Sequence, residues 1–204
     1  LACLAAEPVT FFLALSGRTR YWKRTAAFLD KQTWPKDQVR IVLADTSGSK
    51  KFHKTLKKWV YRSDYDDIRL FKFDVGETSG QADRDRRDDS IRHSVQRSVA
   101  RIYNKMAREI ATEYVFTLED DVLPPADVIY TLMQGFDPST ASVAAPLRSR
   151  YHNGYLHWKW PKEICVDPGS GIEEIAGSGF GCTIIRGSVL KDTVFTSNPK
   201  FCNG

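Results

Sequence analysis

Short apolar runs alternate along the chain with amphipathic stretches, and this pattern predicts strands and helices in turn. Strands are expected at residues 9–15, 39–44, 68–73 and 114–118, where apolar and β-forming residues dominate. Helices are expected at residues 20–31 and 50–61, and a longer one from residue 90, where apolar residues recur at steps of three and four. Strands that alternate with helices predict an α/β fold. We expect a three-layer αβα sandwich around a mostly parallel central sheet.

The remaining segments complete this organisation. Residues 76–89 are polar and contain two glycines, so a loop is expected there, and Pro124 and Pro125 end the fourth strand before a new helix near Ala126. No internal repeat or low-complexity linker interrupts the sequence. Residues 1–204 are therefore expected to form a single domain.

Composition narrows the class of protein. The chain has 204 residues, of which 42% are hydrophobic and 27% are charged, as in a globular protein rather than a disordered one. No apolar run reaches the length of about 18 residues that a membrane-spanning helix needs. The four cysteines form no C-x-x-C pair, so neither a zinc site nor a disulfide framework is indicated. We therefore expect a cytoplasmic protein, with peripheral membrane association as an alternative.

The charge of the chain favours an anionic partner. Thirty Lys and Arg residues stand against 25 Asp and Glu residues, which gives a net charge of +5. Such a balance suits an anionic ligand, an acidic membrane surface or a nucleic acid, and it does not choose among them.

Polar residues follow three of the expected strands. They stand at residues 16–18, 45–47 and 119–121. Ligands of parallel sheets bind beyond the carboxyl ends of the strands, which meet at one edge. We expect these three segments to lie at that edge.

The acidic triplet Glu119, Asp120 and Asp121 is the strongest chemical feature of the sequence. Three adjacent carboxylates repel one another unless a cation or hydrogen-bond donors offset their charge. Oxygen ligands of this kind suit Mg²⁺ or Mn²⁺, and either metal could bridge to a diphosphate. A solvated acidic turn is the alternative.

Several motifs, in this order, resemble family-2-type glycosyltransferases of the GT-A fold. They are residues 9–18 (VTFFLALSGR), 32–35 (QTWP), 41–49 (IVLADTSGS), 104–107 (NKMA), 113–125 (EYVFTLEDDVLPP) and 177–186 (GSGFGCTIIR). The triplet at 119–121 stands where the family has its DXD motif, as an EDD variant. The resemblance extends from about residue 9 to residue 202. It implies a nucleotide-binding half at about 9–121 and an acceptor-side half at about 122–204.

The resemblance also implies roles for single residues. Ser16 and Arg18 would line the donor nucleotide, and Asp45 would accept hydrogen bonds from its base or ribose. An Asx-type turn within the backbone is the alternative for Asp45. Glu119 and Asp120 would approach the ribose and the metal shell, with Glu119 as a second metal ligand, and Asp121 would bind the metal directly. The glycine-rich segment around Gly179 would lie next to the acceptor site.

Arginines are concentrated between residues 84 and 108, and a diphosphate requires such cations. Arg97 and Arg101 are candidates for donor binding. Together with Arg108 they fall on one helical stripe, opposite the apolar stripe that contains Val99 and Met106, which favours a solvated face instead. Arginines 84, 86 and 87 could close over a diphosphate, although interleaved aspartates favour a self-neutralised loop.

The aromatic stretch at residues 148–161 is our candidate for the acceptor side. Sugar faces stack on aromatic rings, so Trp158 and Trp160 are expected to face the acceptor. A β-hairpin that turns at Asn153 and Gly154 and packs on the sheet is the alternative.

The catalytic base is the weakest part of the pattern. Related inverting enzymes carry a carboxylate shortly before an F-C pair, but Phe201 and Cys202 follow Asn198, Pro199 and Lys200 here. Glu173 and Glu174 are the nearest substitutes, and Glu174 is the expected base.

These observations predict a metal-dependent glycosyltransferase. It would use Mn²⁺ or Mg²⁺ to transfer a sugar from a nucleotide-diphosphate donor to a glycan, lipid or protein acceptor. One alternative is a nucleotidyltransferase that forms sugar nucleotides. The other is a non-catalytic nucleic-acid-binding module, which the aspartates among the arginines make less favourable.

Overall fold

The computed structural model describes residues 6–73, 89–149, 153–159, 163–164 and 169–197. The arginines expected in a loop at 84–87, Trp160 and the pair Phe201 and Cys202 lie outside the described residues.

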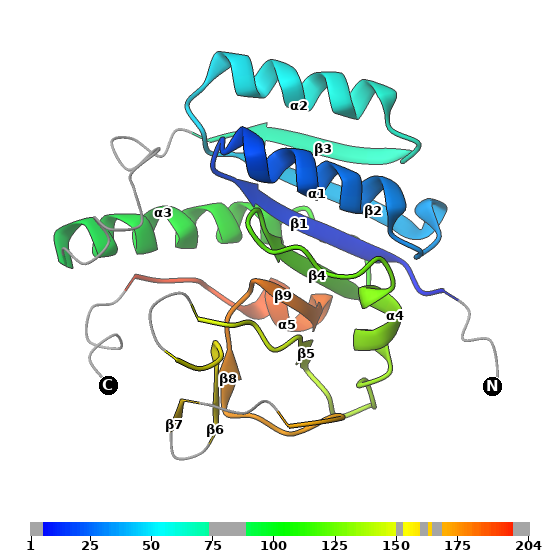
Figure 1. Ribbon diagram of the computed structural model, residues 1–204, viewed down its shortest axis with the longest axis vertical. Helices are drawn as coiled ribbons and strands as arrows, with labels where there is room; N and C mark the ends of the chain where they lie inside the picture. Colours follow the sequence, from blue (N-terminus) through cyan, green and yellow to red (C-terminus); the bar gives the residue numbers. More distant parts are fainter. Residues whose placement is uncertain (1–5, 74–88, 150–152, 160–162, 165–168, 198–204) are drawn as a thin grey trace.

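A six-stranded sheet forms the centre of the molecule, with strand order β3-β2-β1-β4-β9-β5 (Figure 1). Neighbours β3, β2, β1 and β4 are parallel, whereas β9 is antiparallel to both β4 and β5. The strands are β1 (Val9–Leu15), β2 (Val39–Asp45), β3 (Asp67–Lys72), β4 (Tyr114–Glu119), β5 (Ser142–Ala144) and β9 (Cys182–Arg186). The predicted mostly parallel sheet is confirmed.

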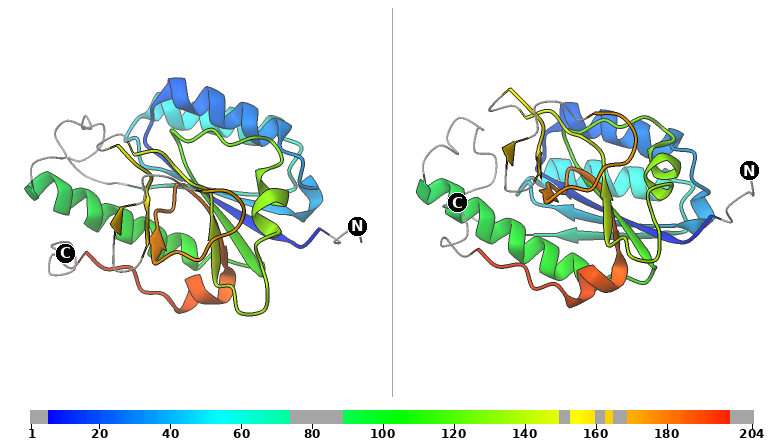
Figure 2. Two further views of the ribbon diagram at one scale, coloured as in Figure 1. Left: turned by 60° about the horizontal axis from the view of Figure 1, so that its bottom comes forward. Right: turned by 90° about the horizontal axis from the view of Figure 1, so that it is seen from below.

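Helices cover both faces of this sheet (Figure 2). One face packs against α1 (Thr19–Lys31), α2 (Lys50–Arg62) and α4 (Val128–Met133), and the other against α3 (Asp89–Ala107) and α5 (Gly187–Asp192). A 3₁₀ turn at Lys36–Gln38 leads into β2. The three-layer αβα sandwich expected from the sequence is therefore confirmed.

Side chains of β1 point alternately to the two helical layers. Phe11 and Leu13 belong to the apolar cluster beneath α1, whereas Phe12 belongs to the cluster beneath α3 with Ile102 and Met106. Successive side chains of a strand point to opposite faces, so a continuous apolar run is required where both faces are covered.

The glycine-rich segment is divided between two sheets. Residues 177–186 divide into β8 (Gly177–Ser178) and β9, which belong to different sheets. The chain leaves one sheet and enters the other at Gly179–Gly181. A Cβ at Gly181 would lie 2.4 Å from Leu147 Cδ1, so a side chain there would require Leu147 to move.

A second sheet of three strands, ordered β7-β6-β8, lies beside the first. It contains β6 (His157–Lys159), β7 (Glu163–Ile164) and β8. Before it, Ser149 donates its backbone N–H to the Gly154 carbonyl at 2.9 Å, and Leu156 donates to Leu147 at 2.7 Å. The aromatic stretch thus makes antiparallel pairings on either side of Asn153, as the hairpin alternative predicts.

Helix α3 departs from the expected burial pattern. Val99 lies on the predicted apolar stripe, yet its side chain is 43% exposed. The helix extends past the edge of the sheet, so its early turns have less sheet to cover them (Figure 1). Arg97, Arg101 and Arg108 are exposed, as the solvated-face interpretation predicts. No helix within the described residues is long and apolar enough to cross a membrane.

Candidate functional site at the carboxyl edge of the sheet

Residues that follow β1 and β4 meet at the carboxyl edge of the sheet. Ser16 donates its backbone N–H to Asp120 Oδ2 at 3.0 Å and its hydroxyl to the same oxygen at 2.7 Å. The Ser16 hydroxyl in turn accepts a hydrogen bond of 2.8 Å from Arg18 Nε. Two segments more than 100 residues apart in the sequence therefore form one hydrogen-bonded cluster.

Arg18 supplies the positive charge of this cluster. Its guanidinium forms an ion pair with Asp120 and donates to Asp121 Oδ2 at 3.0 Å. The side chains of Asp120 and Asp121 are only 7% and 8% exposed. Burial lowers the pKa of Arg18, but hydrogen bonds and the charges of both aspartates more than offset this, and the net shift is upward. The cluster is thus neutralised by a residue of the chain itself.

Gly17 allows the β1 turn to approach the turn that follows β2. Its φ is +89°, a conformation that L side chains rarely adopt, and a Cβ there would lie 2.4 Å from the Cβ of Ser47. Only glycine fits this contact without a shift of the backbone.

Asp45, at the end of β2, is fully buried and binds within the chain. Its Oδ1 accepts from the Ser47 backbone N–H at 3.0 Å and from the Ser47 hydroxyl at 2.6 Å. This arrangement is the Asx-type turn that the sequence analysis gave as the alternative for Asp45. Direct contact between Asp45 and a nucleotide stays a prediction.

His53 is a site residue that the sequence analysis missed. Its Nδ1 lies 2.8 Å from Asp45 Oδ2. Ser49 caps α2 by accepting a hydrogen bond from the Phe52 N–H at 3.2 Å. Because the helix begins there, His53 lies where its side chain reaches Asp45 at the end of β2. The spacing of Asp45, a capping serine and His53 is the signal that could have indicated this contact.

Glu119 lies on the side of β4 that faces β9. Its backbone N–H donates to the Gly181 carbonyl at 3.0 Å. The pKa of Tyr103 on α3 is raised mainly because Tyr103 is buried, and the negative charge of Glu119 raises it further. Its side chain is exposed, unlike those of Asp120 and Asp121. Within the part of the chain that the structure describes, no group of three or more His, Cys, Asp and Glu side chains is placed to hold a metal ion. Metal ligation by Glu119 and Asp121 therefore stays a prediction.

The two candidate arginines lie apart from the acidic cluster. Arg97 and Arg101 are exposed on α3, and among the described residues neither pairs with Asp120 or Asp121. Arg101 lines a pocket of about 400 Å³ together with Phe73, Ser98, Ile102, Asn104, Lys105 and Arg108. Their role in donor binding is untested.

Asn104 has a structural role. Its amide donates to the Phe195 carbonyl and accepts from the Phe195 N–H, both at 2.9 Å. These bonds hold the segment after α5 against α3, where the ring of Phe195 packs on Tyr103 and Phe180.

On the expected acceptor side, Trp158 is 38% exposed on β6. It pairs with Gly177, where an added Cβ would lie 3.6 Å from the Trp158 ring. Next along the chain, an added Cβ at Gly179 would meet no described atom within 4 Å. The ring therefore lies on β6, and the open space beside Gly179 lies just after the neighbouring strand β8.

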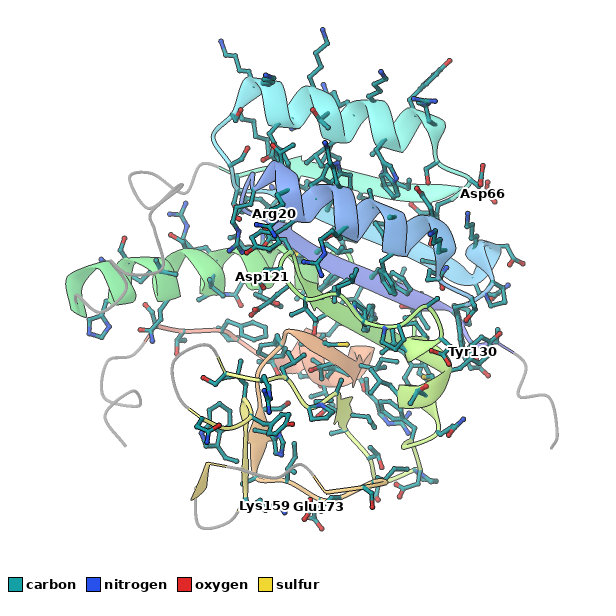
Figure 3. The ribbon with its side chains drawn as sticks, in the orientation of Figure 1. Arg20, Asp66, Asp121, Tyr130, Lys159 and Glu173 are labelled. Atoms are coloured by element: carbon teal, nitrogen blue, oxygen red, sulfur yellow. The ribbon has the colours of Figure 1, made fainter. Side chains whose placement is uncertain are left out.

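Glu174 is exposed in the segment before β8. Its neighbour Glu173 accepts a hydrogen bond of 2.6 Å from Lys159 Nζ on β6. Figure 3 shows Glu173 at the far end of the small sheet from Asp121. No described contact joins Glu174 to the acidic cluster, and its role as a base stays a prediction.

Comparison with solved structures shows what this arrangement is similar to. A mannosyltransferase, PcManGT from Pyrobaculum calidifontis, in complex with GDP-Man and Mn²⁺, matches 72% of the chain at 17% identity with a TM-score of 0.54. TarS 1-349 from S. aureus matches 91% of the chain at 13% identity with a TM-score of 0.58, and its complex with UDP matches at 11% identity with a TM-score of 0.56. The chain shares their fold. It covers 38% of the mannosyltransferase chain and 48% of the TarS 1-349 chain, which is less than half of each. No protein-family model matches the sequence, and no curated protein matches it.

Proposed function

We propose that the chain is a glycosyltransferase that binds a nucleoside-diphosphate sugar at the carboxyl edge of its sheet. The observation that carries this proposal is the bonded cluster of Ser16, Arg18, Asp120 and Asp121, built from the ends of β1 and β4. Parallel sheets bind ligands at this edge. The shared fold supports the proposal, because solved structures with that fold include one with GDP-Man and one with UDP.

Arg18 is the residue that would bind the diphosphate. Its side chain is 34% exposed while it holds the two aspartates, so a ligand can reach part of that side chain. Guanidinium groups bind phosphate oxygens in a bidentate manner. In the absence of a nucleotide, the same group offsets the repulsion between Asp120 and Asp121.

Asp121, with Asp120 beside it, would hold a divalent metal. Magnesium is usually bound by one or two carboxylates, with substrate phosphates and waters as the other ligands, so two convergent aspartates suit such a site. Bound Mn²⁺ or Mg²⁺ would stabilise negative charge on the leaving diphosphate. Glu119, which the resemblance suggested as a second ligand, has an exposed side chain whose Cδ would lie 3.7 Å from a Cβ added at Gly181.

The acceptor would bind at the small sheet. The partly exposed ring of Trp158 offers a stacking surface for a sugar, and the open space beside Gly179 leaves room for it. A glycan, lipid or protein acceptor would have to present its hydroxyl between this sheet and the acidic cluster.

Calorimetric titration tests the donor site directly. UDP and GDP are each titrated into the chain with Mn²⁺ and with EDTA, and we expect one of them to bind at a single site in a metal-dependent manner. Incubation with the matching nucleotide sugar and Mn²⁺ should then release the nucleoside diphosphate slowly, with water taking the sugar in place of the acceptor hydroxyl. If neither nucleotide binds with or without the metal, the proposed function is wrong.

A further inference from the structure

The outer surface of α1 and α2 is strongly basic. Figure 3 shows side chains with nitrogen tips standing out from these helices. All ten cationic Lys and Arg residues of the two helices are exposed, and Asp30 is their only acid. The ten are Arg20, Lys23, Arg24, Lys31, Lys50, Lys51, Lys54, Lys57, Lys58 and Arg62, and we call them the basic face.

Packing between the helices makes this a single surface. The Trp22 ring on α1 contacts both Trp59 and Phe52 on α2, with centroid separations of 5.4 and 6.4 Å. The two helices lie side by side over the same face of the sheet in both Figures 1 and 2. Because each follows a strand of one parallel sheet and both pack on the same face of it, their outer sides lie on one face of the molecule.

The charge of the basic face is not balanced within the molecule. Among the described residues, none of its ten cations forms an ion pair, and Asp30 instead accepts a hydrogen bond of 3.2 Å from Trp59 Nε1. The net charge of the two helices exceeds the +5 of the whole chain. Clustered like charges repel one another and attract an external polyanion.

We propose that the basic face binds an anionic membrane surface. Seven of the ten cations are lysines, which act as point charges and suit a diffuse layer of lipid headgroups. Tyr61, 92% exposed near the end of α2, adds an amphipathic ring of the kind that lies at headgroup level.

A nucleic acid fits the same face less well. Single strands bind through exposed aromatic rings that stack on bases. Trp22 is buried and Trp59 is partly buried between the helices, so the face offers Tyr61 as its one largely exposed aromatic side chain within the described residues.

The basic face lies next to the candidate site. Helix α1 begins at Thr19, directly after Arg18 of the acidic cluster, and Arg20 lies in its first turn (Figure 3). A membrane bound to the basic face would therefore lie beside the carboxyl edge of the sheet. The membrane contact itself does not depend on the proposed glycosyl transfer.

Co-sedimentation of the full chain with lipid vesicles tests the proposal. One set of vesicles is phosphatidylcholine alone and the other contains phosphatidylserine and phosphatidylcholine in equal parts. The variant Lys54→Gln, Lys57→Gln, Lys58→Gln removes three charges from exposed positions of α2. Its matched control, Arg69→Gln, Arg108→Gln, Lys191→Gln, removes the same charge from exposed positions elsewhere. Thermal unfolding of both variants checks that they fold.

We expect binding to the anionic vesicles only, and weakening by added salt. The α2 variant should bind at least about tenfold more weakly, because each lysine near an anionic surface contributes about fivefold. The control should bind like the unmodified chain. Equal binding to both vesicles, no binding to either, or equal loss in the two variants would overturn the proposal. Tighter binding to a single-stranded RNA than to anionic vesicles, lost only in the α2 variant, would assign the face to nucleic acid instead.

Discussion

The guanidinium of Arg18 lies 3.0 Å from a carboxylate oxygen of Asp121, so a cation that follows β1 already pairs with an acid that follows β4. A divalent metal at Asp121 must therefore share this carboxylate with Arg18 or displace it. The competition between the arginine and the metal makes the cluster testable without knowledge of the substrate.

Replacement of Arg18 by alanine should destabilise the chain and increase its response to metal. Asp120 and Asp121 would lose hydrogen bonds to a charged partner, which costs about 1.5–3 kcal/mol. Mn²⁺ alone should then raise the melting temperature of the variant more than that of the unmodified chain, because it relieves the repulsion that Arg18 had offset.

Arg20→Ala is the matched control, since Arg20 is an exposed arginine in the first turn of the same helix. Thermal unfolding with and without Mn²⁺ measures both effects. An equal metal response in the Arg18 and Arg20 variants would show that Arg18 does not compete for a metal site.

Gly17→Ala should lower stability through the backbone alone. The residue would keep a φ of +89°, which costs about 1–2 kcal/mol for an L residue, and its Cβ would clash with Ser47. Gly179→Ala is the control because its added Cβ would meet no described atom within 4 Å. Chemical denaturation of both variants measures the difference. A loss in Gly17→Ala no larger than in Gly179→Ala would mean that the two turns do not meet as described.

Trp158→Ala should impair use of the acceptor more than binding of the donor. Loss of a stacking ring weakens acceptor binding by about tenfold, whereas the ring lies on the small sheet and not in the acidic cluster. The acceptor KM and the nucleotide Kd are the two quantities to compare. A parallel loss of nucleotide binding, or a large fall in melting temperature, would indicate that the ring supports the fold instead.

The raised pKa of Tyr65 predicts that the folded chain loses stability at alkaline pH. Burial is the main cause that raises its pKa to about 12 from 10.0, with smaller contributions from Asp30 and Asp64 and an opposing hydrogen bond from Gln32. The folded chain holds the phenolic proton where the unfolded chain releases it. The stabilisation is therefore complete below about pH 10 and is lost as the pH rises toward 12.

Tyr65→Phe should make the free energy of unfolding fall less steeply over this pH range. It should also cost about 1–2 kcal/mol at neutral pH, because Tyr65 donates to the Leu29 carbonyl and accepts from Gln32. Some slope should remain, since burial also raises the pKa of Tyr103. Tyr61→Phe is the exposed control. An unchanged slope in Tyr65→Phe would contradict the account.

Among the described residues, β1 to β4, α1 and α2, and the start of α3 were predictable from sequence to within one residue. Both faces of β1, β2 and β4 are covered, so their apolar runs are continuous. Gly17 and Gly48, which have positive φ values, lie in the turns that follow β1 and β2. The division of residues 177–186 between two sheets was not predictable. Local composition favours a strand there, whereas the choice of sheet depends on the distant partners of β8 and β9.

The site was predictable in its location and not in its pairings. The alternation of strands and helices predicts a parallel sheet, and that alone placed Ser16, Asp45 and the acidic triplet at one edge. The sequence did not indicate that Asp45 would bind His53, or that Arg18 would pair with both Asp120 and Asp121, because these contacts depend on side-chain directions after folding. The exposure of Val99 was mispredicted: within the described residues the buried side chains of α3 begin only at Ala100, and the helix before them extends past the edge of the sheet (Figure 1).

Thermal unfolding of Asp121→Asn with UDP or GDP, in Mn²⁺ and in EDTA, tests the central claim most directly. Asp192→Asn, an exposed aspartate at the end of α5, is the matched control. We predict that the nucleotide raises the melting temperature of the unmodified chain and of the control in Mn²⁺ only, and that Asp121→Asn loses this shift while it still folds. A full metal-dependent shift in Asp121→Asn would contradict the assignment of the metal to Asp121. The absence of any nucleotide shift in the unmodified chain would contradict the glycosyltransferase proposal itself.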